Sequence, residues 1–434
     1  MSTIVMKFGG TSVADPDKIR AAAKRAIAAK KKGHKVAMVV SAMGKTTDRL
    51  EGLAFATAEQ PHKREWDQLM ATGEQVTISL VAMALQDMGE DAISFTAGQI
   101  GMVTDDAHTK ARLQRINAKR IQSELDAGRI VIIAGFQGVT EAGDVTTLGR
   151  GGSNVTLVAV AATIGADVCE NYTDVDGVYT ADPRIVPGAR KLDVVTYDEM
   201  LEMASLGAGV LHNRAVEFAK KYDVPIHVRS SLNNRKGTMI VAENPAMEKI
   251  VVRGAALKEK LARITLKNVP DKPGVAARLF HALAKAGIVV DDIVQTQDEN
   301  KKATVTFTIE MRDLPEAEAV CEGLIAKSLK GAELSYVADL AKVSAIGAGM
   351  RVHTGVAERM FGALADGKVN IQNITTSEIK ISCIIDSGDG KKALKIVHDA
   401  FDLGRRPRRT KTAKRTAKKT AKKATKKARA TARK

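Results

Sequence analysis

Short apolar runs alternate with amphipathic stretches along the first half of the chain. The run at residues 3–8 is followed by apolar residues at helical spacing, which begin after Asp15-Pro16 and end at Gly33. An Asp N-cap, a Pro in the first turn and a Gly after the last turn are typical of an α-helix. The alternation continues: it predicts strands at 36–40, 92–95, 130–136, 167–172 and 225–228, and helices at 66–88, 109–127, 155–164 and 210–222.

Strands that alternate with helices predict a mainly parallel sheet covered by helices, which is an α/β fold. Ligands bind such sheets at the carboxyl ends of the strands. Lys7, Ser41, Arg150 and Asp174 all lie at or just beyond the ends of predicted strands. We therefore expect these four side chains to face one crevice.

An internal repeat begins after residue 245. Each copy predicts a helix opened by Gly and then two strands, at 289–294 and 304–309 or at 369–374 and 379–385, so we expect two α+β modules of βαββαβ type. Residues 273–293 align without gaps on residues 354–374, with identities at Gly274/Gly355, Val275/Val356, Ala276/Ala357, Arg278/Arg359, Phe280/Phe361, Ala282/Ala363, Leu283/Leu364, Ala284/Ala365 and Ile293/Ile374. The predicted domains are 1–245, 246–337 and 338–403, followed by a tail at 404–434.

Composition excludes several classes of protein. The chain has 434 residues, of which 44% are hydrophobic, as in folded soluble proteins. No apolar run approaches the roughly 20 residues that a membrane-spanning helix needs, so we expect a cytoplasmic protein without membrane contact. The three cysteines, Cys169, Cys321 and Cys383, and the eight histidines lack metal-ligand spacing. They predict reduced, mostly buried thiols and no dedicated metal site.

The net charge of +17 belongs to one segment. Residues 405–434 hold 16 of the 67 Lys and Arg residues and no acid, which leaves 51 basic residues against 50 acidic ones elsewhere. The segment has almost no apolar side chain larger than Ala, so it is predicted to be disordered when free. It resembles the Lys/Ala/Thr-rich tails of linker-histone-type proteins, which implies nonspecific binding to nucleic-acid phosphates. A solvated extension without a partner is the alternative.

Glycine-containing loops carry the candidate chemistry. Between the predicted strand at 130–136 and the helix at 155–164 lies Gly149-Arg150-Gly151-Gly152-Ser153. Its glycines let the backbone approach a ligand, Ser153 is predicted to cap the helix, and Arg150 offers a planar fork to a carboxylate or phosphate. A second loop, Gly44-Lys45-Thr46, is similar to the end of a Walker A loop. That motif requires Gly five positions before Gly44, where this chain has Val39, so we reject a P-loop.

Six motifs in order closely resemble the aspartate kinase family: residues 7–13, 41–44, 47–48, 72–74, 146–153 and 173–184. The likeness covers residues 1–403, and the paired repeat is similar to that family's two ACT modules. The resemblance implies transfer of the γ-phosphoryl group of ATP to the β-carboxylate of L-aspartate, giving 4-phospho-L-aspartate, the committed step toward lysine, threonine, methionine and isoleucine. A carboxylate nucleophile is already ionised at neutral pH, so positioning and charge neutralisation suffice without a general base.

The resemblance also implies the role of each site residue. Lys7 would stabilise the transferring phosphoryl group, Glu74 would hold the substrate ammonium, and Asn154 stands where the family typically has an Asp that organises the Lys. The implied ATP-binding residues are Lys7, Phe8, Gly9, Gly10, Ser41, Thr173, Asp174, Tyr179, Thr180, Ala181, Asp182, Pro183 and Arg184. The implied substrate-binding residues are Ser41, Thr47, Glu74, Arg150, Gly151, Gly152 and Ser153. Mg²⁺ would arrive with ATP.

Feedback by lysine, threonine or both is implied for the repeat, together with a homo-oligomer formed through the ACT modules. The expected effector-binding residues are Asp271, Gly274, Asp291 and Gln295 in the first copy and Gly355, Val356, Asn370, Ile371 and Glu378 in the second. Two alternatives stay open. One is a catalytically weak relative, with Asn154 in place of Asp, that senses an amino acid and docks on nucleic acid. The other is a different amino acid kinase, such as acetylglutamate or glutamate kinase.

Overall fold

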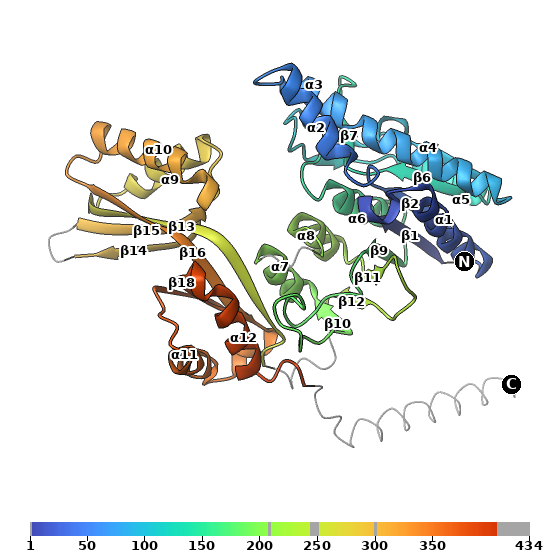
Figure 1. Cartoon of the computed structure of the whole chain (residues 1–434). Helices are drawn as coiled ribbons and strands as arrows, with labels where there is room; N and C mark the ends of the chain where they lie inside the picture. Colours follow the sequence, from blue (N-terminus) through green and yellow to red (C-terminus); the bar gives the residue numbers. More distant parts are fainter. Residues whose placement is uncertain (1, 207–209, 244–250, 299–301, 406–434) are drawn as a thin grey trace, which may run out of the picture.

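The computed structural model describes residues 2–206, 210–243, 251–298 and 302–405. Figure 1 shows two bodies, an N-terminal one that ends with β12 and a C-terminal one that begins with β13. The helices of the N-terminal body are α1 (Pro16–Lys31), α2 (Thr46–Thr57), α3 (Lys63–Met70), α4 (Thr72–Asp87), α5 (Ala118–Asp126), α6 (Gly152–Thr163), α7 (Tyr197–Ser205) and α8 (Asn213–Tyr222). Its strands are β1 (Thr3–Phe8), β2 (Lys35–Val40), β3 (Ala92–Phe95), β4 (Val103–Thr104), β5 (Leu113–Arg115), β6 (Ile130–Ala134), β7 (Gln137–Val139), β8 (Val145–Thr147), β9 (Val168–Thr173), β10 (Val194–Thr196), β11 (Ile226–Ser230) and β12 (Thr238–Val241).

The main sheet confirms the predicted α/β fold. Its eight strands run in the order β10-β12-β11-β9-β1-β2-β6-β3, and every neighbouring pair is parallel except β11 with β12. Helices α1 and α4 bury their apolar sides against one face, while α5, α6, α7 and α8 cover the other. The sheet is therefore apolar on both faces, and polar side chains reach solvent at the strand ends.

Helix α1 forms where its N-cap Asp and first-turn Pro predict. The Asp15 side chain accepts a hydrogen bond from the Lys18 backbone N–H at 2.9 Å, and Pro16 occupies the first turn. Ile19 and Ala23 are buried against the sheet. Capping and burial of one face thus agree about where this helix starts and which side it presents to the core.

Several predicted elements have different bounds in the structure, among them the strand predicted at 369–374, which is β17 (Asn373–Ser377), and the helix predicted at 210–222, which begins at Asn213 as α8. The helix predicted at 66–88 is two helices, α3 and α4, with a break at Ala71. At this break the side chain of Gln137 donates a hydrogen bond to the Ala71 carbonyl at 2.6 Å. The helix predicted at 109–127 is only α5: Thr109 has a φ of 71°, and residues 113–115 pair as β5. The strand predicted at 130–136 ends at Ala134, before Phe136 with a φ of 69°.

A second small sheet, β5-β4-β7-β8, stands above the strand ends and was not predicted. Its strands have two or three residues each, too short to show a period in the sequence. It places Thr147 and the loop that follows directly beside the carboxyl end of the main sheet, where the site lies.

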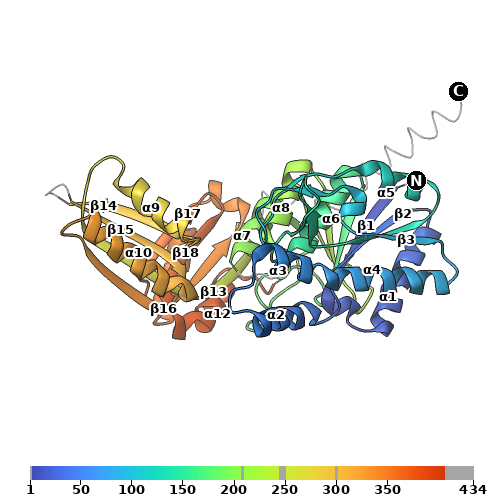
Figure 2. The same ribbon diagram turned by 90° about the horizontal axis from the view of Figure 1, so that it is seen from above.

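The C-terminal body contains one six-stranded antiparallel sheet, in the order β14-β15-β13-β16-β18-β17. Figures 1 and 2 show it meeting the N-terminal body where α7 contacts β13 and β16. Its elements are β13 (Gly254–Pro270), α9 (Val275–Lys285), β14 (Asp291–Gln297), β15 (Lys302–Glu310), α10 (Leu314–Lys327), β16 (Glu333–Ile346), α11 (Val356–Asp366), β17 (Asn373–Ser377), β18 (Lys380–Asp386) and α12 (Gly390–Ala400).

The internal repeat is visible in the backbone. Gly274 and Gly355 occupy matching N-cap positions of α9 and α11 with φ values of 86° and 84°, a left-handed conformation that favours Gly. The first copy is βαββαβ, as predicted. The second takes its fourth strand from the first half of β13, since residues 254–258 pair with the second half of β16.

The two modules consequently share strands β13 and β16. The division predicted between residues 337 and 338 falls inside β16, and Ala255 packs in the core of the second module while Ala262 packs in that of the first. A long strand that contributes to two cores contains no turn in its sequence to mark where one module ends. The boundary predicted between residues 337 and 338 therefore does not separate the two modules. The boundary predicted at residue 245 and the tail after residue 405 lie outside the described residues.

The three thiols are buried and free, in agreement with the sequence. Burial raises the pKa of Cys321 to about 11 and that of Cys383 to about 12. Across the described ranges, no helix is long and apolar enough to cross a membrane.

Candidate functional site

Two cavities open at the carboxyl ends of the parallel strands. The first, of about 450 Å³, is lined by Lys7, Ser41 and Arg150 from the predicted crevice. Asp174, the fourth predicted residue, lines a second cavity of about 440 Å³ instead. The strand tips are adjacent, because β1 pairs with β9 and the Gly9 N–H donates to the Tyr172 carbonyl at 3.4 Å. The predicted crevice is therefore two neighbouring cavities.

Lys7 lies at the end of β1 with only 9% of its surface exposed. Its ammonium faces the first cavity, and among the described residues no carboxylate lies within ion-pair distance of its Nζ. Burial lowers the pKa of Lys7 to about 8, because a charge in an apolar strand end loses hydration. The arrangement holds a cation ready for an anionic ligand.

Glu74 supplies a buried carboxyl on the first turn of α4. Its Oε1 accepts the Ala42 backbone N–H at 2.9 Å, but its buried Oε2 has no partner in the structure. Burial raises the pKa of Glu74 to about 7, partly offset by the bond from Ala42. A ligand ammonium at Oε2 would stabilise the ionised form.

The start of α6 differs from the prediction that Ser153 caps it. Gly151 is the N-cap, with a φ of 74°, and a Cβ there would lie 2.4 Å from the Cβ of His212. Ser153 is instead buried within the first turn, where its Oγ accepts a hydrogen bond from Ser41 Oγ at 3.0 Å. This bond ties the loop after β2 to α6. The tight packing excludes a side chain at the cap, and the turn is closed by its own backbone: the Gly152 and Asn154 N–H groups donate to the Gly149 and Gly151 carbonyls, each at 2.9 Å.

Asn154 follows in the same turn and lines the first cavity. Its Oδ1 is buried and lacks a hydrogen-bond partner in the structure. Glu74 and Asn154, each with a buried oxygen that lacks a partner, thus line the same cavity as Lys7. Buried polar groups are almost always satisfied in proteins, so this convergence points to a polar ligand that carries both signs of charge. All predicted substrate-binding residues line this cavity: Ser41, Thr47, Glu74, Arg150, Gly151, Gly152 and Ser153.

Asp67 is a positioning residue that the sequence did not reveal. It lies on α3, fully buried, and accepts hydrogen bonds from the Thr109 N–H at 2.9 Å, Thr147 Oγ1 at 2.6 Å and His108 Nδ1 at 2.9 Å. Thr109 and Thr147 both line the first cavity. One carboxylate therefore fixes two loops from the small sheet against α3. No motif marks it, since an acidic residue in an amphipathic helix is ordinarily on the exposed side.

Arg214 holds the same loops from the other side. Its guanidinium donates to the Leu148 carbonyl at 2.7 Å and to the Ala111 carbonyl at 3.2 Å. Partial burial lowers the pKa of Arg214 from its ordinary value. The Gly149–Gly152 loop is thus clamped between α3 and α8, which keeps Arg150 at the cavity mouth.

The second cavity gathers most of the predicted nucleotide residues: Thr173, Asp174, Tyr179, Ala181, Asp182, Pro183 and Arg184. Of the other six, Lys7, Gly10 and Ser41 line the first cavity, and Phe8, Gly9 and Thr180 line neither. Thr180 is fully buried, and its Oγ1 is 3.1 Å from His398 Nε2 and accepts the Arg190 N–H at 2.9 Å. The Phe8 ring is buried against Tyr172 with centroids 4.7 Å apart. Neither side chain reaches the cavity, because both serve the packing behind it.

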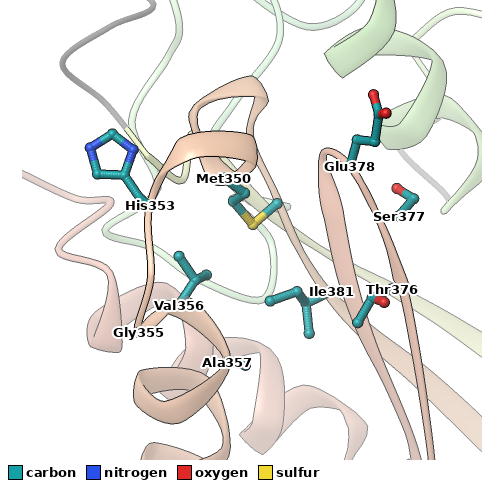
Figure 3. Close-up of a pocket in the computed structure, with 9 residues that line it drawn as sticks. All are labelled: Met350, His353, Gly355, Val356, Ala357, Thr376, Ser377, Glu378 and Ile381. Carbon is teal, nitrogen blue, oxygen red and sulfur yellow. The ribbon is translucent and has the colours of Figure 1, made fainter.

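A third cavity, of about 440 Å³, opens at the start of α11 (Figure 3). The predicted residues Gly355, Val356 and Glu378 line it, together with His353 and Ser377. Asn370 and Ile371 are not among its lining residues.

The predicted effector residues of the first copy are engaged differently. Asp271 accepts a hydrogen bond from the Gln297 side chain at 2.6 Å, and Asp291 pairs with Lys342 Nζ at 2.6 Å. The bond to Lys342 lowers the pKa of Asp291, against the opposing effect of burial. Gly274 caps α9, and Gln295 is exposed on β14. Within the described residues, no group of three or more His, Cys, Asp or Glu side chains is placed to bind a metal ion.

Comparison with known proteins is consistent with this geometry. Residues 2–230 match the model of the amino acid kinase family, and residues 263–320 and 343–401 match ACT domain models. Aspartokinase 2 of Bacillus subtilis is 49% identical over 407 residues, which cover 94% of this chain and 99% of that protein.

Solved structures agree. E. coli aspartokinase III in complex with aspartate and ADP is 26% identical, with a TM-score of 0.78, over 92% of this chain and 99% of that one. Aspartate kinase from Synechocystis is 41% identical, with a TM-score of 0.52, over 94% of this chain and 71% of that one.

Proposed function

This chain belongs to the aspartokinases of the amino acid kinase family, and we infer that it transfers the γ-phosphoryl group of ATP to the β-carboxylate of L-aspartate. The product is 4-phospho-L-aspartate, the precursor from which lysine, threonine, methionine and isoleucine are made. The observation that carries the proposal is that Lys7, Glu74 and Asn154 line one cavity, the latter two with buried oxygens that lack a partner. The ammonium of L-aspartate would pair with Glu74, and a phosphate of ATP would pair with the Lys7 ammonium.

The reaction needs little covalent help from the protein. The β-carboxylate attacks as an anion, so two negative groups must be brought together and their charge neutralised. We assign neutralisation to Lys7 and to the backbone N–H group of Gly10, because the Gly9 N–H already donates to the Tyr172 carbonyl. Glu74 holds the substrate ammonium, and Arg150 with Thr47 holds its α-carboxylate. Ser41 lies between the two reactants.

The nucleotide is assigned to the second cavity. Thr173, Asp174, Tyr179 and Arg184 line it, and the E. coli relative binds ADP. We propose that Mg²⁺ enters with the ATP phosphates and that Asp174 is the carboxylate beside it, since Mg²⁺ is commonly held by one or two carboxylates plus substrate phosphates. The metal supplies further neutralisation of phosphate charge.

Trapping with hydroxylamine tests the function directly. Protein incubated with ATP, Mg²⁺ and L-aspartate should form aspartyl hydroxamate, because hydroxylamine cleaves acyl phosphates. N-acetyl-L-glutamate and L-glutamate serve as control acceptors and should give none. Absence of hydroxamate from L-aspartate would contradict the proposal. The two alternatives, a sensor with weak catalysis and a kinase for another acidic substrate, are not favoured, because the close relatives are named for aspartate kinase activity.

The pH dependence of kcat/KM for L-aspartate should be bell-shaped. Glu74 must be ionised to bind the ammonium, and its pKa of about 7 is above the ordinary value, so activity falls as pH drops below about 7. Lys7 must be protonated, and its pKa of about 8 is below the ordinary value, so activity falls above about 8. Initial rates between pH 5.5 and 9.5 measure both limbs. A flat profile over this range would exclude these two groups.

Replacing Asp67 by Asn should raise KM for L-aspartate about tenfold and leave KM for ATP unchanged. An amide cannot accept all three bonds, and each hydrogen bond to a charged group contributes about 1.5–3 kcal/mol. Steady-state kinetics with either substrate varied separates the two constants. Asp87→Asn, exposed on α4, is the matched control. Equal changes in both KM values would indicate general loosening of the fold rather than positioning of the acceptor.

Feedback inhibition by lysine, threonine or both is proposed for the C-terminal body, with the cavity at α11 as one binding site. A homo-oligomer through this body is supported by exposed apolar side chains on its edge strands. Ile293 on β14 is 51% exposed, and Ile374, its equivalent in the repeat on β17, is 43% exposed. Unpaired strand edges with apolar side chains favour association with another copy.

The basic tail is proposed to bind nucleic acid without sequence preference. If about six phosphates are neutralised, the logarithm of the affinity for double-stranded DNA should fall with the logarithm of salt concentration at a slope near −5. Fluorescence anisotropy of a labelled duplex measures this slope. A chain ending at Gly404 is the control and should bind far more weakly. Equal binding by both chains would show that the tail is a solvated extension.

A further inference from the structure

The second cavity has walls from both bodies of the molecule. The N-terminal body contributes charged lining residues, Asp174, Asp182 and Arg184. The apolar lining includes three side chains from around α7 and four residues from the C-terminal body. These are Met203, Leu206 and Val210, and then Ala255, Ala256 and Leu257 of β13 and Leu394 of α12.

The contact between the bodies at this point is built into their cores. Ala181 and Val186, from the loop that lines the cavity, belong to the same buried apolar cluster as Val343 and Leu394. The loop therefore packs as part of the core of the second ACT module. Moving α12 would displace this loop as well, because close-packed cores transmit such shifts.

Hydrogen bonds reinforce the contact. The Ala255 N–H donates to the Thr180 carbonyl at 2.7 Å, and the Thr180 hydroxyl lies 3.1 Å from His398 Nε2. All three residues are buried. Thr180 was expected to bind nucleotide directly, and its position instead fastens the cavity loop to β13 and α12.

The presence of both charged and aliphatic lining residues fits the two halves of a nucleotide. Phosphates and ribose require charged and polar partners, while a purine base is flat and largely apolar and binds between aliphatic side chains. We propose that Leu257 and Leu394 of the regulatory module contact the purine base of ATP, so that the regulatory half completes the nucleotide site. This inference rests on the proposed function of the second cavity.

A consequence concerns regulation of the same site. Val356 and Ile381 line the cavity at α11, shown in Figure 3, and both belong to the buried cluster that contains Leu394. The cavity at α11 and the second cavity are thus lined by residues of the same buried apolar cluster. Any coupling between an amino acid at α11 and the nucleotide through this core would act by the same factor in both directions.

The test is the equilibrium binding of ADP, which requires no catalysis. Leu257→Trp places a large side chain at the half-buried wall and should raise the Kd of ADP, measured by calorimetry, at least tenfold. Glu259→Trp, exposed on the same strand, is the matched control and should leave the Kd within twofold. Leu394→Ala, which removes contact area from α12, should weaken ADP severalfold. KM for L-aspartate should change less than twofold in all three variants. The two Trp variants should keep the wild-type melting temperature, whereas Leu394→Ala, whose side chain is buried in the core of the second module, lowers it and is therefore assayed well below its melting temperature.

The outcomes separate the two proposals. If the wild type forms hydroxamate and both Leu257→Trp and Leu394→Ala bind ADP as tightly as the wild type, the regulatory wall is not part of the nucleotide site and this inference is overturned. If ADP binding weakens as expected but no hydroxamate forms, the inference stands and the proposed function fails.

Discussion

Replacing Lys7 by Met is expected to lower kcat for 4-phospho-L-aspartate formation by about a thousandfold. Two unit charges about 4 Å apart interact by about 4 kcal/mol at an effective dielectric constant near 20. Each 1.36 kcal/mol of transition-state stabilisation is tenfold in rate. Met keeps the length and apolar character of the Lys stem but removes the ammonium, so the loss reports on charge. The hydroxamate assay at saturating ATP and L-aspartate measures it.

The expected loss of activity in Lys7→Met should not come from a loss of folding stability. The pKa of Lys7 lies below its ordinary value, so the folded state disfavours the ammonium at pH values under about 8. Removing the charge should therefore leave the melting temperature at pH 7 unchanged or higher. Lys45→Met is the control, since Lys45 is exposed and belongs to the loop that only partly matches Walker A. Loss of activity in Lys45→Met, with Lys7→Met active, would reverse the assignment.

Replacing Asn154 by Asp should raise kcat by between about tenfold and a thousandfold. Asn154 lines the cavity with an Oδ1 that has no partner, and in the part of the chain that the structure describes no carboxylate lies within ion-pair distance of the Lys7 ammonium. A carboxylate at position 154 would orient the ammonium and add up to the Coulomb energy estimated above. The lower bound applies because the Asn154 carbonyl, although it lacks a partner in this structure, is itself able to accept a hydrogen bond from the Lys7 ammonium.

The pH profile provides an independent readout of the same substitution. A new carboxylate favours the protonated form of Lys7, so the alkaline limb of kcat/KM should move above pH 8 in Asn154→Asp. Asn154→Ala is the control: it removes the amide without adding charge and should leave that limb in place. If Asn154→Asp is no faster than the wild type and its alkaline limb does not move, Asn154 does not act through Lys7.

The sequence predicts elements whose signals are local. Helix α1 has its cap, its proline and its apolar face within one short segment, and each agrees with the others. The shared strands β13 and β16 could not be divided from sequence, because a strand that crosses from one core to another changes partners without any turn. The helix break at Ala71 was missed because its cause, the side chain of Gln137, is distant in the chain.

The site residues also divide into those with a local sequence signal and those whose role depends on residues distant in the chain. Glycine-containing motifs identify the cavity walls, including Lys7, Ser41 and Arg150, since spacing around a strand end is a local property. Ser153 was predicted as a cap because its type suits one, but the contact of Gly151 with His212 decides the geometry. Asp67 and Thr180 depend on partners from other elements, and only tertiary structure reveals what they hold.

The most direct test of the central claim is a crystal structure of the chain with L-aspartate, Mg²⁺ and a non-hydrolysable ATP analogue. The account predicts the terminal phosphate within hydrogen-bond distance of Lys7 Nζ, the aspartate ammonium at Glu74 and the purine in the cavity that begins at Thr173. A terminal phosphate bound away from Lys7, or an aspartate outside the cavity lined by Glu74 and Arg150, would contradict it.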